Sequence, residues 1–232
     1  MNSLNKILIV SVLLLLAACV PPVVFNQPFP PNEDDLLSIP EKYHGIFMCE
    51  SDSTLVIINE KVIYAREPYY FEEKISDLEE FEDCQMIDGK LVMNATGEIV
   101  PVEFVGEDRV KGHFIEQDTI FELGENGIAR PYDGNLLLSV AFKDGEWAVN
   151  GLTREANGNI VYRAINEATD LELVDNITPL TEIEKEDVDD PPRYVARPTL
   201  VQFDRMFRNE RIYIECEVLI RVKYEELTND FF

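Results

Sequence analysis

The side chains through which this chain could carry out chemistry are its two histidines, four cysteines and many carboxylates. Only His44 and His113 would titrate near neutral pH, so a general base has a narrow choice. The sequence contains no Gly-x-Ser-x-Gly elbow, no glycine-rich phosphate loop and no His-Glu-x-x-His pair. These absences argue against a serine hydrolase, a nucleotidase and a zinc protease, and we expect no catalytic residue.

The 45 acidic residues make paired carboxylates too common to single out a catalytic pair. A glycosidase needs two such groups about 5 to 9.5 Å apart across a sugar cleft, and no spacing here selects them. The aromatic residues 69–71 and Trp147 could line a sugar or peptide groove, although core packing is the default for such side chains.

Calcium is the metal ion whose oxygen ligands are most abundant in this sequence. Candidate ligands lie at Asp187, Asp189 and Asp190, and around Asp133 and Asn135. Neither group has the spacing of a calcium-binding EF-hand loop. We therefore interpret both as solvated acidic loops and expect no cofactor.

The formal net charge of -25 limits the kinds of partner. Phosphate backbones are bound by clusters of Lys and Arg, so nucleic acid is excluded as a partner. A basic protein or a divalent cation is the expected class of partner for so acidic a surface.

Residues 7–16 are apolar apart from Ser11 and are followed by Ala17-Ala18-Cys19. The apolar run is well short of the roughly 20 residues that span a bilayer, which favours a cleaved export signal. The stretch resembles the lipobox of bacterial lipoprotein precursors. The resemblance implies a signal peptide over residues 1–18 and lipid attached to Cys19. Because Val20 follows the cysteine, it also implies the cell envelope, at the outer membrane.

If Cys19 carries lipid, then Cys49, Cys84 and Cys216 remain. Three cysteines in an oxidising compartment allow one disulfide, and a bridge between Cys49 and Cys84 is left open. Cys216 alternates with apolar residues of a predicted strand over residues 212–222, so we expect it to be buried.

Proline is concentrated between residues 19 and 38, which predicts a flexible tether without helix or sheet. In polyproline geometry it would hold the domain up to about 50 Å from the membrane. The soluble domain is expected over residues 39–232, with a possible subdivision near the acidic loop 182–192.

Short apolar runs separated by turn signals predict a mainly β domain, an antiparallel meander forming a barrel or a sandwich with two short helices. Asn-Gly and Asp-Gly pairs favour tight hairpin turns. The run 135–142 is apolar on both faces, as in a central strand. The expected strands are 46–49, 55–58, 62–65, 91–95, 99–105, 110–115, 119–123, 135–142, 147–153, 160–165 and 212–222.

Two helices are expected. Phe71, Ile75 and Leu78 have the i, i+4, i+7 spacing of an amphipathic helix. Thr199 followed by Gln202 forms a capping box that opens a second helix, buried on its Leu and Phe side.

The region after Ile39 resembles lipoproteins of unknown function from flavobacterium-type bacteria. The matching features are Pro40 before Gly45, residues 118–123, Trp147 near Leu152, and Thr199 before the helix. The resemblance implies an envelope location and a β-rich domain, and it implies no activity.

The sequence therefore predicts a lipid-anchored, non-enzymatic binding or assembly module of the outer membrane or periplasm. Its partner would be an envelope protein or polymer. Two alternatives remain open, namely a lipid-anchored glycan hydrolase that uses carboxylates and a lipocalin-like carrier of an apolar ligand.

Overall fold

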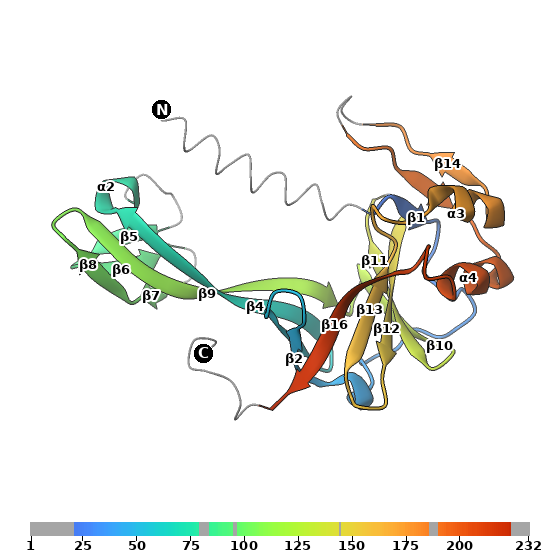
Figure 1. Cartoon of the computed structure of the whole chain (residues 1–232), viewed down its shortest axis with the longest axis horizontal. Helices are drawn as coiled ribbons and strands as arrows, with labels where there is room; N and C mark the ends of the chain where they lie inside the picture. The colour runs from blue at the N-terminus through green and yellow to red at the C-terminus, as the bar shows by residue number, and fades with distance from the viewer. Residues whose placement is uncertain (1–20, 79–83, 95–96, 144, 186–189, 224–232) are drawn as a thin grey trace.

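The computed structural model describes residues 21–78, 84–94, 97–143, 145–185 and 190–223 of the chain. It is mostly β structure, as predicted, with one large sheet and one small one. Figure 1 shows an elongated molecule in which a long ribbon projects from a larger body. We call residues 62–122 the arm and the rest of the described chain the body. In the part described, no helix is both long and apolar enough to cross a membrane.

The large sheet runs in the order β14-β15-β1-β12-β13-β16-β2-β3-β4-β9-β8, and β10 and β11 extend it from β12. It does not close into a barrel, which is consistent with a sandwich. Only the pairing of β1 with β15 is parallel among the described strands. Its strands are β1 (Val23–Phe25), β2 (Gly45–Cys49), β3 (Leu55–Ile58), β4 (Val62–Lys74), β8 (Val102–Val105), β9 (Arg109–Glu122), β10 (Gly127–Tyr132), β11 (Asn135–Ala141), β12 (Trp147–Arg154), β13 (Ile160–Ala164), β14 (Leu180–Glu182), β15 (Tyr194–Ala196) and β16 (Ile214–Val222).

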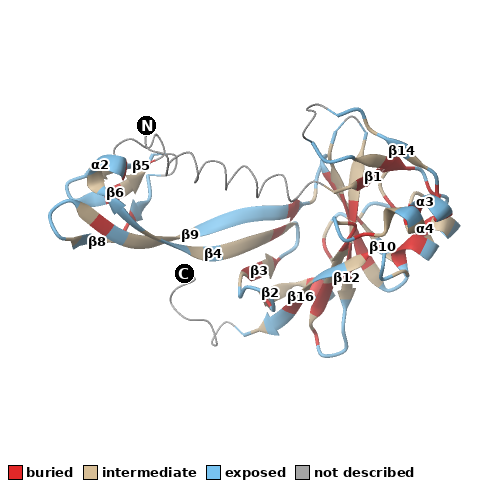
Figure 2. Cartoon of the chain, turned by 45° about the horizontal axis from the view of Figure 1, so that its top comes forward, coloured by how far each residue is buried: buried red, intermediate tan, exposed pale blue. Residues whose placement is uncertain are grey.

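The small sheet caps the end of the arm. It contains β5 (Cys84–Ile87), β6 (Lys90–Met93) and β7 (Ile99–Val100). The described helices are the 3-10 turn η1 (Glu41–Tyr43), α2 (Ile75–Leu78), α3 (Leu171–Ile177) and α4 (Leu200–Phe207). Figure 2 shows the buried residues concentrated in the body, with a smaller buried group at the tip of the arm.

Hairpin turns lie where Asp-Gly pairs predict them. Asp88 and Asp133 adopt positive φ, and each is followed by a glycine with positive φ. An aspartate tolerates this left-handed region better than most residues, and glycine adopts it freely. These two turns connect β5 to β6 and β10 to β11, which confirms the prediction at both places.

The central strand β11 separates two hydrophobic clusters, as its sequence predicts. Leu137 faces the first, which we call the helix cluster and which includes Phe25, Phe29, Phe203, Phe207 and Tyr213. Leu136 and Leu138 face the second, which we call the sheet cluster and which includes Phe47, Val56, Leu152 and Leu219. Alternation of side chains along a strand places them on opposite faces, and both faces here are covered.

Helix α4 closes the helix cluster and begins as predicted. Thr199 and Gln202 form a reciprocal capping box at its N-terminus. Phe203, Met206 and Phe207 point from this helix into the core and are buried. The buried Phe and Met side chains anchor α4 against the sheet, whereas Leu200, which was expected on the buried side, is 40% exposed.

The expectation of a tether over residues 19–38 is wrong for the described residues 21–38. Val23, Val24 and Phe25 form β1 and are buried. The strand pairs in parallel with β15, and Phe29 packs against Phe25 beside it. Proline occupies positions 21, 22 and 28, outside the three residues that pair, so it does not interrupt the sheet.

The helix expected from Phe71, Ile75 and Leu78 is also wrong over most of its length. β4 continues to Lys74, and α2 covers only Ile75–Leu78. The reason is tertiary: the strand pairs with β9 along its whole length, and this ladder outweighs a local helical spacing. The acidic loop near 182–192 does not divide the domain, because β14 and β15 on either side of it pair with each other.

Candidate functional site

The arm has a narrow stretch where only two strands pair in the described chain. The last β3 pair is Leu55 with Arg66, and the first β8 pair is Val102 with Gly112. Between them, residues 67–70 of β4 pair with residues 113–116 of β9 without a third strand. We call this stretch the neck. A two-stranded ribbon is marginal in water, so its side-chain pairs decide its stability.

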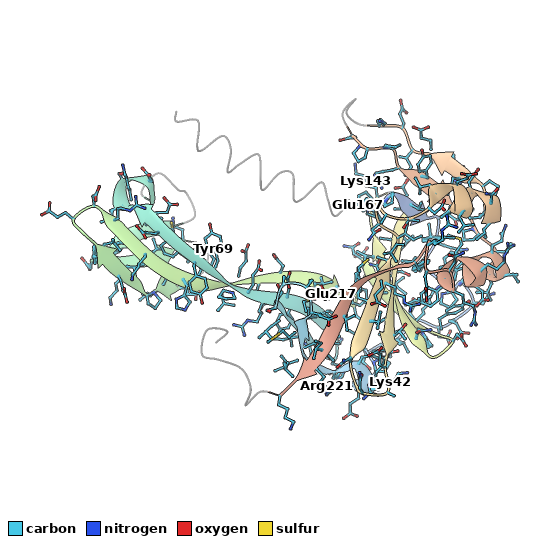
Figure 3. All side chains as sticks on the ribbon, viewed as in Figure 1. Lys42, Tyr69, Lys143, Glu167, Glu217 and Arg221 are labelled. Atoms are coloured by element: carbon cyan, nitrogen blue, oxygen red, sulfur yellow. The ribbon has the colours of Figure 1, made fainter. Side chains whose placement is uncertain are left out.

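Aromatic pairs cover both faces of the neck. The ring centroids of Tyr69 and Phe114 lie 5.2 Å apart on one face, and those of Tyr70 and His113 lie 5.4 Å apart on the other. Cross-strand pairs of this kind contribute roughly 0.2–1 kcal/mol each. Tyr69 and Tyr70 nevertheless remain 46% and 62% exposed, and Figure 3 shows Tyr69 on the arm between its tip and the body.

Exposed apolar side chains lie along the arm from its base to its tip. The large ones on the described residues of the arm are Tyr69, Tyr70, Ile87, Ile99, Phe104 and Ile120. The body contributes Leu37, Leu200, Val201 and Ile220, which are separated on different elements apart from the neighbours on α4. Exposed apolar side chains gathered on a projecting element are typical of a surface that binds a partner.

A groove of about 610 Å³ runs beside the neck, lined by residues of β4, β8 and β9 that include Tyr70 and His113. Two carboxylates border it, and both are ion-paired: Glu72 with Arg109 at 3.1 Å and Glu103 with Lys111 at 2.9 Å. The hydrogen bond from Lys111 lowers the pKa of Glu103. A general acid of a glycosidase needs a raised pKa, so Glu103 is poorly suited to that role.

Comparison with family models, with curated proteins and with solved structures finds no match to this chain. The interpretation of the candidate site therefore rests on its geometry alone.

The cysteines singled out from the sequence have different outcomes in the structure. Cys19 lies outside the described residues. Cys49 and Cys84 are not joined by a disulfide, because one lies in the sheet cluster and the other in the cluster at the tip of the arm. Cys216 is exposed, contrary to expectation, because Leu219 and not Cys216 faces the core from β16.

The histidines and the calcium candidates are occupied by ordinary protein contacts. His44 Nε2 lies 2.8 Å from the carbonyl oxygen of Ile39. Asp133 accepts a hydrogen bond from Arg208 at 2.7 Å, and Asn135 accepts one from Thr153 at 2.6 Å. Asp187 and Asp189 lie outside the described residues. Within the described ranges, no group of three acidic, His or Cys side chains is arranged to hold a metal ion.

Negative charge accumulates on the body side of the neck. Glu67 pairs directly with Glu116 across the ribbon, and Asp118 lies on the same face of β9. Burial, followed by the charges of Asp118 and Glu67, raises the pKa of Glu116. The folded ribbon therefore holds the Glu116 proton more tightly than the unfolded chain does, and stability is lost as pH rises through the raised pKa.

Glu116→Gln is expected to stabilise the protein at pH 7 by roughly 0.5 kcal/mol, because it removes one of two like charges that face each other across strands. The gain should disappear below about pH 4, where the wild-type carboxyl is protonated. Thermal unfolding followed by circular dichroism at both pH values measures this. Glu107→Gln, on the exposed turn between β8 and β9, is the matched control. Equal gains from both variants would contradict a specific repulsion at the neck.

Proposed function

We propose that this chain is a non-enzymatic, lipid-anchored envelope protein whose arm binds a partner protein or an envelope polymer. The observation that carries the proposal is the two-stranded neck with exposed Tyr69 and Tyr70 on its opposite faces. Tyrosine supplies a large apolar contact together with a polar hydroxyl, which is why it is enriched at binding surfaces.

The negative charge near the neck and on the whole chain limits the class of partner that the arm can bind. The neck carries Glu67 and Glu116 beside its aromatic pairs, Asp118 lies next to it on β9, and the whole chain has a net charge of -25. A surface that combines apolar rings with negative charge favours a partner with basic groups around an apolar patch. The anchor at Cys19, which the lipobox resemblance implies, would restrict the search for that partner to the membrane surface.

Tyr69→Ser combined with Tyr70→Ser is expected to weaken partner binding at least tenfold, because buried aromatic anchors dominate interface energies. The measurement is a pull-down from membranes with the native lipidated protein, together with co-sedimentation with insoluble cell-wall polymer. Leu200→Ser combined with Val201→Ser is the matched control, because it removes two exposed apolar side chains from α4 in the body.

The same two measurements on the Cys19→Ser variant distinguish recruitment of the partner by the lipid from recognition of the partner by the arm. A partner lost with Cys19→Ser but retained by the tyrosine variant would show that the lipid recruits it and would count against the arm. Saturable turnover of a glycan or another hydrolase substrate by the purified chain would contradict a non-enzymatic role.

A further inference from the structure

An apolar cavity of about 220 Å³ lies where the base of the arm meets the body and is lined by residues of the large sheet. Strands from both halves of the sheet contribute to its wall, so residues far apart in sequence surround one space. The wall consists of Cys49, Val56, Ile58, Ile63, Ile120, Leu138, Leu152, Tyr162, Glu217 and Leu219.

The cavity is part of the sheet cluster and not a gap between loops. Val56, Leu138 and Leu152 line it and are also buried members of that cluster. Protein interiors are normally packed as densely as organic crystals, and unfilled apolar space loses dispersion contacts on its walls. The space is partly open to solvent beside the exposed Ile120, and its apolar wall is therefore a place where an apolar ligand would gain contacts that the protein alone does not make.

A carboxylate at the rim of the cavity determines which charge a bound ligand can carry. Glu217 lines it, and its carboxylate accepts hydrogen bonds from the backbone of Glu50 at 2.9 Å and from the Ser51 hydroxyl. Figure 3 shows Glu217 on β16 in the body. These bonds hold the negative charge in place, so an anionic ligand would be repelled. Ile120 is 43% exposed and forms the wall nearest solvent.

We propose that this cavity is a binding site for one small, neutral, apolar molecule. An apolar cavity of about 150 Å³ holds benzene, so by volume this one holds about nine carbon atoms. The site includes Ile63 and Ile120 at the base of the arm but no residue of the neck, and its occupant is distinct from the partner proposed for the neck.

The test compares 1-octanol with octanoate, which have the same chain length and differ in charge. Isothermal titration of the full chain with Cys19→Ser at pH 7 is expected to show one saturable octanol site and at least tenfold weaker binding of octanoate. Absence of octanol binding, or equal binding of both compounds, would overturn the proposal.

Two variants that fill the space locate the site. Val56→Phe and Ile120→Phe are each expected to reduce octanol affinity at least tenfold. Val201→Phe is the matched control, because Val201 is 72% exposed on α4 and does not line the cavity. Ile120 is partly exposed, so its replacement tests the site even where Val56→Phe disturbs folding. Full octanol affinity in a folded Ile120→Phe chain would refute the location.

Cys49 supplies a second readout without any substitution in the cavity. Its thiol lines the space, whereas Cys216 is exposed elsewhere. Labelling with methyl methanethiolsulfonate, followed by peptide mass spectrometry, is expected to slow at least fivefold at Cys49 in saturating octanol and to stay constant at Cys216. Equal rates at Cys49 with and without octanol would contradict occupation of the cavity.

Discussion

Replacing Phe25 by alanine is expected to lower the free energy of unfolding by about 3–5 kcal/mol, the usual cost of deleting a buried phenyl ring. Phe25 is fully buried in the helix cluster. Its ring centroid lies 5.4 Å from that of Phe29 and 5.8 Å from that of Phe203. Its loss would therefore leave a cavity between β1 and α4.

This experiment decides between a strand and a tether near the N-terminus. Urea unfolding followed by circular dichroism measures the loss, and Leu37→Ala is the matched control because Leu37 is 90% exposed. The control is expected to change stability by less than about 0.5 kcal/mol. A loss below about 1 kcal/mol for Phe25→Ala would mean that residues 23–25 do not belong to the folded body.

Gly127→Ala is expected to destabilise the protein by about 3 kcal/mol, at the upper end for overpacking. A Cβ atom at this position would lie 1.9 Å from the carbonyl oxygen of Glu122 and 3.2 Å from the ring of Phe121. The first contact is with backbone, so β9 or β10 must shift to relieve it. Such a shift would loosen the base of the arm, because Phe121 belongs to the sheet cluster.

Gly124 provides a control in the same turn. A Cβ atom there meets nothing within 4 Å, so Gly124→Ala is expected to change stability by less than about 0.5 kcal/mol. Urea unfolding of both variants gives the comparison. Similar losses at both positions would show that the turn, and not the close approach at Gly127, controls stability.

Local patterns in the sequence were sufficient to predict much of the fold. The capping box at Thr199, the Asp-Gly turn at Asp133 and the two apolar faces of the strand near Leu137 each depend on residues close together in sequence. These signals report backbone preferences and burial, and tertiary contacts reinforce them.

Elements defined by distant partners were not predicted. β1 pairs with β15, so Val23 meets Tyr194 from the other end of the chain. β1 is three residues long and α3 is seven residues long, and elements this short give little periodic signal in the sequence. The spacing of Phe71, Ile75 and Leu78 predicted a helix because sequence alone does not reveal the ladder with β9.

The candidate sites also depend on contacts between residues that are distant in sequence. Tyr69 and Tyr70 were recognised as aromatic residues that could line a groove, but their exposure follows from the pairing at the neck, where no third strand of the described residues joins β4 and β9. The cavity was an open question at the sequence level, because its wall draws single residues from strands of both halves of the sheet. No short motif contains that information.

If Cys19 carries the proposed lipid, the early start of β1 would limit how far the protein can stand from a membrane. Val23 follows the proposed lipid site at Cys19 by four residues, a stretch that extends at most about 14 Å. A tether of about 50 Å would have let the body sample a wide volume, whereas so short a link would keep the body of a lipidated protein next to the lipid headgroups. The 13-residue β4 spans about 43 Å. The arm, rather than a flexible linker, would therefore set the working radius of the anchored protein.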